Sequence, residues 1–82
     1  MKRNLALYPG KQVRFRFYNS VDREFYGPVY SGKVMEVASN CRKPGTNGKG
    51  PFAKIWASVE YKIDQKQTLT AWVQQKEILV IE

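Results

Sequence analysis

Hydrophobic and polar residues alternate along most of the chain, a pattern that predicts β-strands. In the run Lys11–Asn19, Val13, Phe15 and Phe17 fall on one face and the residues between them on the other. The run Phe52–Ile63 alternates in the same way, and no stretch of about eleven or more residues carries a helical stripe. The pattern therefore predicts an all-β chain.

Further segments complete the expected sheet. Three more strands are predicted at Val29–Ala38, Thr68–Val73 and Ile78–Ile81. Glycine, proline and polar residues predict connections at Ser20–Pro28, Ser39–Pro51 and Asp64–Gln67. A single helical turn is predicted at Gln74–Glu77. Gly32, inside a strand pattern, predicts a bulge or a close approach of another backbone.

The pairing of the third and fourth strands follows from keeping apolar residues on one face. Placing Ile63 opposite Leu69 also sets Tyr61 against Ala71, and Val59 against Val73. A slip by one residue would set these apolar side chains against threonines. In this register Trp56 and Trp72 lie on the face away from the core and are expected to point outward.

Length and composition limit the function classes. A chain of 82 residues with 43% hydrophobic and 13% aromatic content forms one small core and no second domain. The absence of histidine excludes a Ser-His-Asp triad and the usual metal sites, and a single cysteine excludes a disulfide framework. Cys41 has no histidine to act as its base, so neither a catalytic role nor a cofactor is expected.

The expected location is cytoplasmic. The basic start Met1-Lys2-Arg3 is followed only by Leu5-Ala6-Leu7, which is too short for the apolar region of a signal peptide. No run approaches the length of a membrane span. The lone Cys41 suits a reducing compartment.

The end of the chain resembles the close of SH3-like small β-barrels. Residues Thr70–Ile81 show the order of strand, short 3-10 turn and final strand, and the step Gly32-Lys33-Val34 after an aromatic-rich loop is common in that superfold. The resemblance implies a single five-stranded SH3-like barrel over residues 1–82. In that arrangement residues 39–51 form a flexible, basic Gly/Pro-rich loop.

Positive charge is concentrated in one part of the chain. The formal net charge is +7, with a balance of +8 in residues 1–54 and −1 in residues 55–82. Such asymmetry indicates one basic surface that binds a polyanion. The residues expected to contact phosphates are Arg14, Arg16, Arg42, Lys43, Lys49 and Lys54. The residues expected to stack on bases are Tyr18, Tyr30 and Trp56.

The leading hypothesis is therefore a small protein that binds DNA or RNA, mainly through the phosphate backbone. The run Arg14-Phe15-Arg16-Phe17-Tyr18 and the step Tyr26-Gly27-Pro28 resemble the basic SH3-like C-terminal domains of retroviral integrases. That resemblance implies binding with little base selectivity, since no recognition helix is expected. Small size and an isolated basic domain suggest a bacterial, phage or mobile-element accessory protein.

Two other classes stay open. Outward Trp56 and Trp72 would suit a protein interface, either a homo-oligomer or an acidic partner. Type II dihydrofolate reductases are SH3-like chains of similar length, but their Val-Gln-Ile-Tyr segment would fall at Leu69-Thr70-Ala71-Trp72, where all four residues differ. A proline-peptide binder is not expected, because the acidic first loop of eukaryotic SH3 domains is absent.

Overall fold

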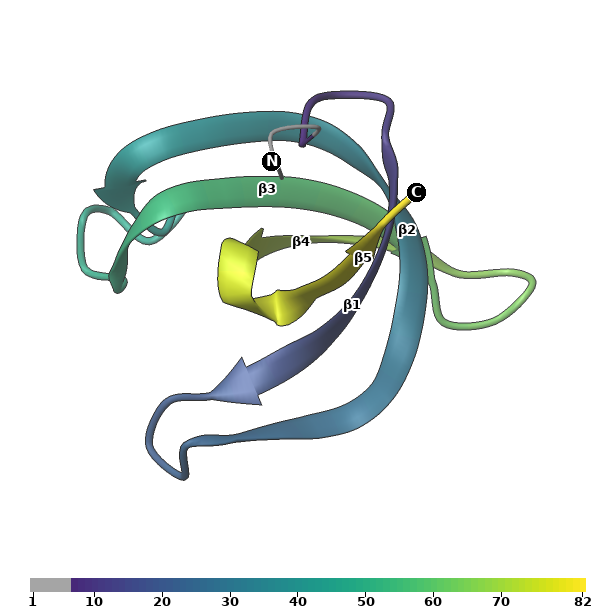
Figure 1. Ribbon diagram of the computed structural model, residues 1–82, viewed down its shortest axis with the longest axis horizontal. Helices are drawn as coiled ribbons and strands as arrows, with labels where there is room; N and C mark the ends of the chain where they lie inside the picture. The colour runs from purple at the N-terminus through teal and green to yellow at the C-terminus, as the bar shows by residue number, and fades with distance from the viewer. Residues whose placement is uncertain (1–6) are drawn as a thin grey trace.

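The structure is a computed structural model that describes residues 7–82, and these form one antiparallel β-sheet with almost no helix (Figure 1). Its elements are β1 (Gln12–Asn19), β2 (Glu24–Arg42), β3 (Phe52–Lys62), β4 (Thr68–Gln74), the 3-10 helix η1 (Gln75–Glu77) and β5 (Ile78–Ile81). The predicted all-β class and the helical turn before the last strand are confirmed. Met1-Lys2-Arg3 and Leu5-Ala6, which carried the argument on a signal peptide, lie outside the described residues.

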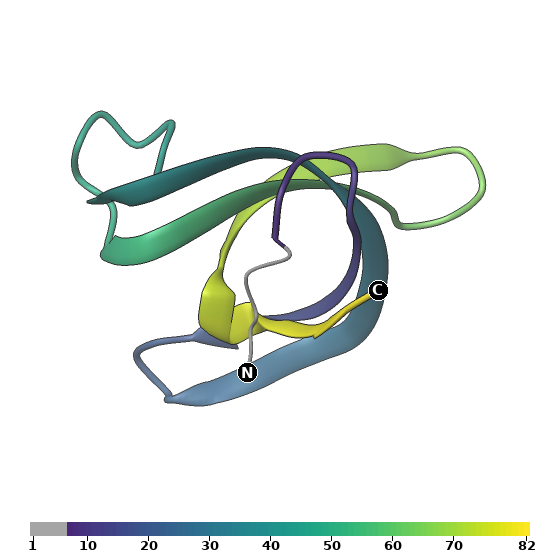
Figure 2. The same cartoon turned by 45° about the horizontal axis from the view of Figure 1, so that its top comes forward.

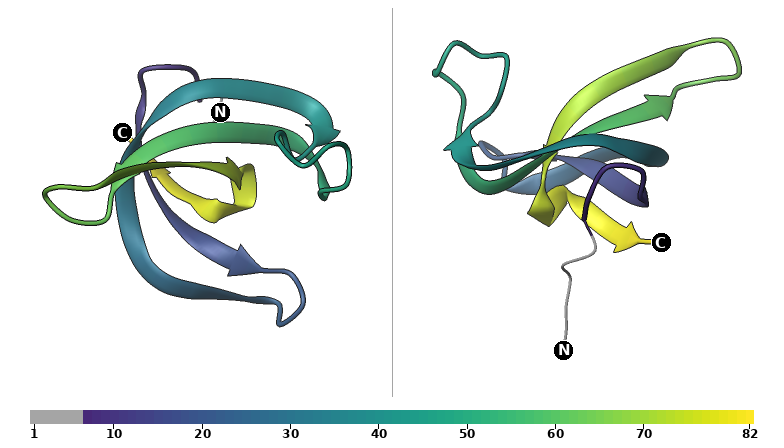
Figure 3. Two further views of the ribbon diagram at one scale, coloured as in Figure 1. Left: turned by 180° about the vertical axis from the view of Figure 1, so that it is seen from behind. Right: turned by 90° about the horizontal axis from the view of Figure 1, so that it is seen from above.

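The strands follow the order β4-β3-β2-β1-β5, and each neighbouring pair is antiparallel. The sheet curls strongly, so that its two edge strands, β4 and β5, curve round toward each other (Figures 2 and 3). In the described part of the chain β4 and β5 each pair with one strand only, and the sheet is therefore curved but not closed. The same residues contain no helix of the length and apolarity that a membrane crossing needs.

The core lies on the concave side of the curved sheet. Val13 and Phe15 of β1 are buried, and Phe17 packs against them, as the alternation of β1 predicts. The buried residues of the core are Val13, Phe15, Val34, Ala57, Val59, Tyr61 and Val73. Strands β1, β2, β3 and β4 all contribute to it, so the core depends on contacts between distant parts of the sequence.

Gly32 marks a close approach between β2 and β3, as its position in the strand pattern predicts. A Cβ atom at this residue would lie 2.4 Å from Cγ1 of Val59 and 2.7 Å from the carbonyl oxygen of Glu60. Since both atoms belong to the packed centre of β3, only glycine fits here. The contact lets β2 bend tightly over the core.

β2 is much longer than predicted, because residues 24–28 and 39–42 belong to it rather than to loops. The predicted loop Ser20–Pro28 is thus reduced to a turn of four residues. Asn19 holds this turn, since its Oδ1 accepts hydrogen bonds from the backbone N–H groups of Val21 (2.8 Å) and Asp22 (3.2 Å). The register shifts between Phe15 and Phe17, where Pro28, which lacks an N–H, lies in the bulged part of β2.

The predicted register of β3 and β4 is wrong by two residues. Tyr61, not Ile63, pairs with Leu69, and Val59 pairs with Ala71. The apolar residues keep their face, because a shift of two preserves the alternation. The turn decides the register: Oδ1 of Asp64 accepts the backbone N–H groups of Lys66 (2.7 Å) and Gln67 (2.9 Å), which centres the hairpin one residue earlier than expected.

Candidate functional site

A hollow of about 180 Å³ lies where three connections of the sheet meet. The β1–β2 turn, the β2–β3 loop and the segment from β4 into η1 each contribute residues to it. Figure 1 and the rear view in Figure 3 place the β1–β2 and β2–β3 connections at the same end of the molecule, with the β3–β4 turn at the other end. We call this hollow the aromatic groove, because Phe17, Tyr18, Tyr26, Trp56 and Trp72 line it.

The β1–β2 hairpin forms one wall of the aromatic groove. Phe17 and Tyr26 face each other across the two strands, with nearly parallel rings whose centroids are 6.0 Å apart. Tyr18 packs edge-on against Phe25 at 5.1 Å on the same hairpin. The ammonium group of Lys76, from η1, lies 4.4 Å from the centroid of the Tyr18 ring and so places a cation beside this wall.

Trp56 forms the floor of the aromatic groove and is only 2% exposed. Its indole N–H donates a hydrogen bond of 3.0 Å to the backbone carbonyl of Cys41, which satisfies the ring's polar atom. The prediction that Trp56 points outward is wrong. Alternation placed it correctly on the face opposite Ala57, but β3 is buried on both faces at this point. Trp56 therefore supports the groove and offers no free face for stacking or for a protein partner.

The β2–β3 loop forms the second wall and carries a cation into the groove. Lys43 and Pro51, which both line it, are joined by a backbone hydrogen bond of 2.8 Å from the N–H of Lys43. The side chain of Thr46 accepts the N–H of Gly50 at 2.9 Å, and Nη1 of Arg42 donates to the carbonyl of Gly50 at 2.9 Å. These bonds hold the side chain of Lys43 at the edge of the groove.

Glu77 is the acidic group among the described residues that line the groove, and its carboxylate oxygens accept hydrogen bonds from the backbone. One carboxylate oxygen accepts the N–H of Tyr18 at 3.0 Å and the other accepts the N–H of Gln74 at 2.8 Å. The side chain is 8% exposed. Glu77 thus fastens η1 to β1 and fixes the end of the groove.

The structure brings together four of the residues singled out from the sequence. Tyr18, Lys43, Trp56 and Trp72 line the same hollow, although they come from four different parts of the chain. Trp72 is half-buried there, on β4 beside Ser58. The prediction that it lies outside the apolar core cluster agrees with this placement.

The other predicted residues lie elsewhere. Arg14 is exposed and pairs with the carboxylate of Glu82 at 3.1 Å. The Nε atom of Arg16 donates to the carbonyl of Gly27 at 2.7 Å. Tyr30 packs against the core, with its ring 4.9 Å from that of Tyr61. Two further cations, both exposed and neither lining the groove, are Lys49 and Lys54.

Sequence reasoning missed two residues that line the groove, Phe17 and Tyr26, and one cation beside it, Lys76. Phe17 was assigned to the core and Tyr26 to a loop, whereas they pair across β1 and β2 beside the groove. The aromatic residues on both sides of the short Asn19 turn are the signal that could have joined them into one hairpin. Lys76 has no such signal, because its position over Tyr18 depends on how η1 packs against β1.

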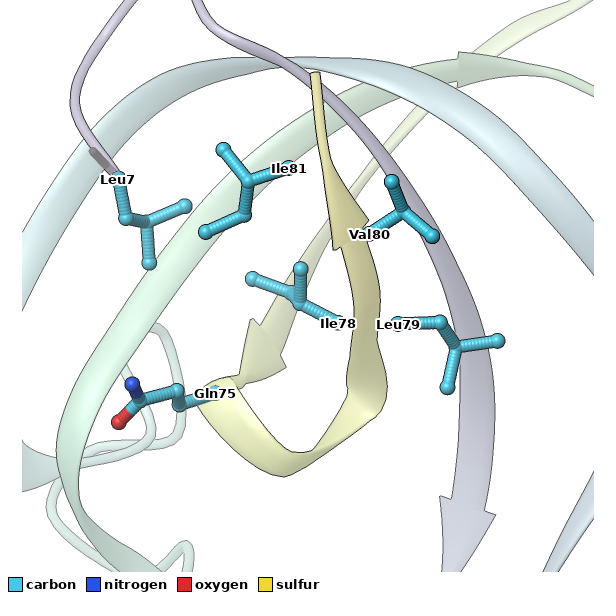
Figure 4. Close-up of a pocket in the computed structure, with 6 residues that line it drawn as sticks. All are labelled: Leu7, Gln75, Ile78, Leu79, Val80 and Ile81. Atoms are coloured by element: carbon cyan, nitrogen blue, oxygen red, sulfur yellow. The ribbon is translucent and has the colours of Figure 1, made fainter. Parts of the chain in front are cut away.

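A larger hollow of about 420 Å³ lies next to β5 (Figure 4). Leu7, Ile78 and Ile81 pack against the core, whereas Leu79 and Val80 project to the other side of the strand and are exposed. Among the described residues that line this hollow none is charged.

Comparison of the chain with protein-family models, with curated protein sequences and with solved structures gave no match. The function is therefore argued from the geometry and charge of the aromatic groove.

Proposed function

We propose that this protein binds nucleic acid and that the aromatic groove is its binding site. The observation that carries the proposal is the meeting of aromatic side chains with Lys43 at one hollow, beside which Lys76 lies over the ring of Tyr18. Ammonium groups release counterions from phosphates, and aromatic faces stack on bases. The described residues that line the hollow beside β5 include neither a lysine nor an aromatic ring.

The charge of the whole chain supports a polyanionic ligand. The net charge is +7, and Arg14–Glu82 is the ion pair found among the described residues. Most of the positive charge is thus free of internal partners in that part of the chain. Such a field attracts nucleic acid over a distance and supplies affinity that does not depend on sequence.

The proposal includes an SH3-like barrel as the fold. The curved five-stranded sheet, η1 between β4 and β5, and the close approach at Gly32 support this assignment. In this arrangement the strands form the scaffold, and the connections at one end carry the binding residues.

A charge-reversal pair tests the proposed site. Lys43→Glu with Lys76→Glu reverses the cation that lines the groove and the one that lies over Tyr18, and binding of labelled oligonucleotides is followed by fluorescence anisotropy at about 50 and about 200 mM salt. The matched control is Lys62→Glu with Lys66→Glu, which makes the same change of net charge near the β3–β4 turn. Circular dichroism and a thermal melt verify that both variants are folded.

We expect the groove variant to bind at least about tenfold more weakly than the control, with the slope of log affinity against log salt reduced by about two. Equal losses in the two variants would contradict the groove as the site. No binding of wild-type protein to single-stranded DNA, duplex DNA or RNA at the lower salt would contradict nucleic-acid binding altogether.

Protein interaction is a second candidate function, favoured by a separate observation. Leu79 and Val80 are exposed apolar residues on β5, a strand at the edge of the sheet. Such an edge can pair with another chain. Binding through this surface would respond little to salt, whereas phosphate binding weakens steeply, so the salt titration separates the two functions.

A further inference from the structure

We infer that the aromatic groove takes an unpaired base, so that the preferred ligand is single-stranded nucleic acid rather than a duplex. This inference rests on the proposed function and adds the structural class of the ligand. It is carried by the size of the groove, by the exposure of one of its rings and by the position of its cations.

The dimensions of the groove favour one flat ring over a double helix. Its volume is about 180 Å³, and it is walled by the β1–β2 hairpin on one side and the β2–β3 loop on the other. A planar base can enter such a hollow, whereas a duplex presents only its edges and backbone. In the described residues η1 is the helix, and its three residues cannot serve as a recognition helix in a major groove.

Tyr26 supplies the ring best placed to stack on a base. Its side chain is 53% exposed, and the inner side of the ring is backed by Phe17 at 6.0 Å. A ring held in this way loses little conformational freedom when a base stacks on its open side. Trp72, half-buried on the β4 side, gives the base a second aromatic contact, while the buried Trp56 supports the floor of the groove.

Two cations are available to the phosphates of a strand bound there. Lys43 lines the groove from the β2–β3 loop, and Lys76 of η1 lies outside its lining, over the ring of Tyr18. Glu77 keeps its negative charge at the end of the groove, where its two oxygens accept backbone N–H groups and the residue is 8% exposed. A strand crossing the groove can present its base to the rings and its backbone to the two lysines.

The test compares ligands that carry phosphates with and without available base faces. The probes are thymidine and uridine oligomers of about eight nucleotides, an abasic oligomer of the same length, and a hairpin duplex with the same number of phosphates. We expect the tighter of the two base-carrying oligomers to bind at least about tenfold more tightly than the abasic oligomer and the duplex.

Tyr26→Ala should reduce affinity for the base-carrying oligomer by about tenfold and leave affinity for the abasic oligomer unchanged. Tyr8→Ala is the matched control, because Tyr8 is also 53% exposed and has a lysine ammonium, from Lys11, 5.6 Å from its ring, but does not line the groove. Trp72→Leu provides a second groove variant if Tyr26→Ala does not fold.

Equal affinity for base-carrying oligomers, abasic oligomer and duplex would overturn this inference and leave nucleic-acid binding itself standing. Equal losses in Tyr26→Ala and Tyr8→Ala would also overturn it. No binding to any probe would instead overturn the proposed function.

Discussion

At the scale of single residues, Tyr61 shows how the core makes the protein sensitive to alkaline pH. It is 8% exposed, and its ring lies 5.2 Å from that of Phe15 and 4.9 Å from that of Tyr30. Burial raises the pKa of Tyr61 above the ordinary value of 10.0, and the nearby phenols of Tyr30 and Tyr26 raise it further. The folded state therefore holds this proton more tightly than the unfolded state does.

Because the pKa of Tyr61 is higher in the folded protein, its contribution to stability is complete below pH 10 and is lost as the pH rises through the folded value. We expect the urea midpoint of wild-type protein to fall more between about pH 8 and about pH 11 than that of Tyr61→Phe. Tyr8→Phe, which changes an exposed ring outside the core, is the control and should fall as wild type does. An equal fall in wild type and Tyr61→Phe would contradict this account.

The burial of single residues could be predicted from the sequence only where no distant segment packs over them. Alternation identified the buried Val13 and Phe15 because their neighbours in the strand are polar. For Trp56 it gave the face but not the burial, since the indole is held by the carbonyl of Cys41 fifteen residues earlier. Burial of this ring on the outer face depends on a contact with the end of β2, and the periodicity of β3 carries no signal for such a contact.

At the scale of elements, the attachment of η1 to β1 depends on a single carboxylate. Glu77 accepts N–H groups from Tyr18 and from Gln74, and it is 8% exposed. Its removal would leave two donors in a partly buried place without their charged acceptor, which costs about 2 kcal/mol. We expect Glu77→Ala to lower the free energy of unfolding by that amount, as measured by urea denaturation.

The control for Glu77→Ala is Glu36→Ala, which removes an exposed carboxylate from β2 and should cost less than about 0.5 kcal/mol. Glu77→Gln keeps one acceptor oxygen and should lie between the two. If Glu77→Ala were as stable as Glu36→Ala, the carboxylate would not hold η1 to β1.

The extents of strands were predicted well where the hydrophobic pattern of the strand itself defines them. Strand register and length were predicted poorly where a turn or a bulge determines them. The extents of β1, β3 and β5 agree with the sequence to within one residue, because alternation alone defines them. The register of β3 and β4 was missed because the side chain of Asp64, rather than the apolar pairs, centres the hairpin. The length of β2 was missed because Gly27 and Pro28 look like loop residues, yet they occupy a bulge within the strand.

At the scale of the whole molecule, the candidate site exists only after folding. Tyr18, Lys43 and Trp72 are far apart in sequence, and the curvature of the sheet brings their elements to one end. The sequence indicated the types of residue, cations and aromatic rings, and the excess of positive charge in the first 54 residues. It grouped Arg14 and Arg16 with the cations of residues 42–54 as one phosphate-binding surface, because no local pattern shows which of these residues the fold brings together.

The central claim, that the aromatic groove binds nucleic acid, is tested most directly by NMR on the full chain. The protein, labelled with ¹⁵N, is titrated with the tighter of the two base-carrying oligomers, and the backbone and indole N–H signals are followed. The account predicts that the largest shifts fall on the indole of Trp72 and on the amides of Tyr18, Tyr26 and Lys43, with little change at Val80 of β5, which does not line the groove. Shifts confined to β5, or to the outer face of β1 around Arg14, would contradict it.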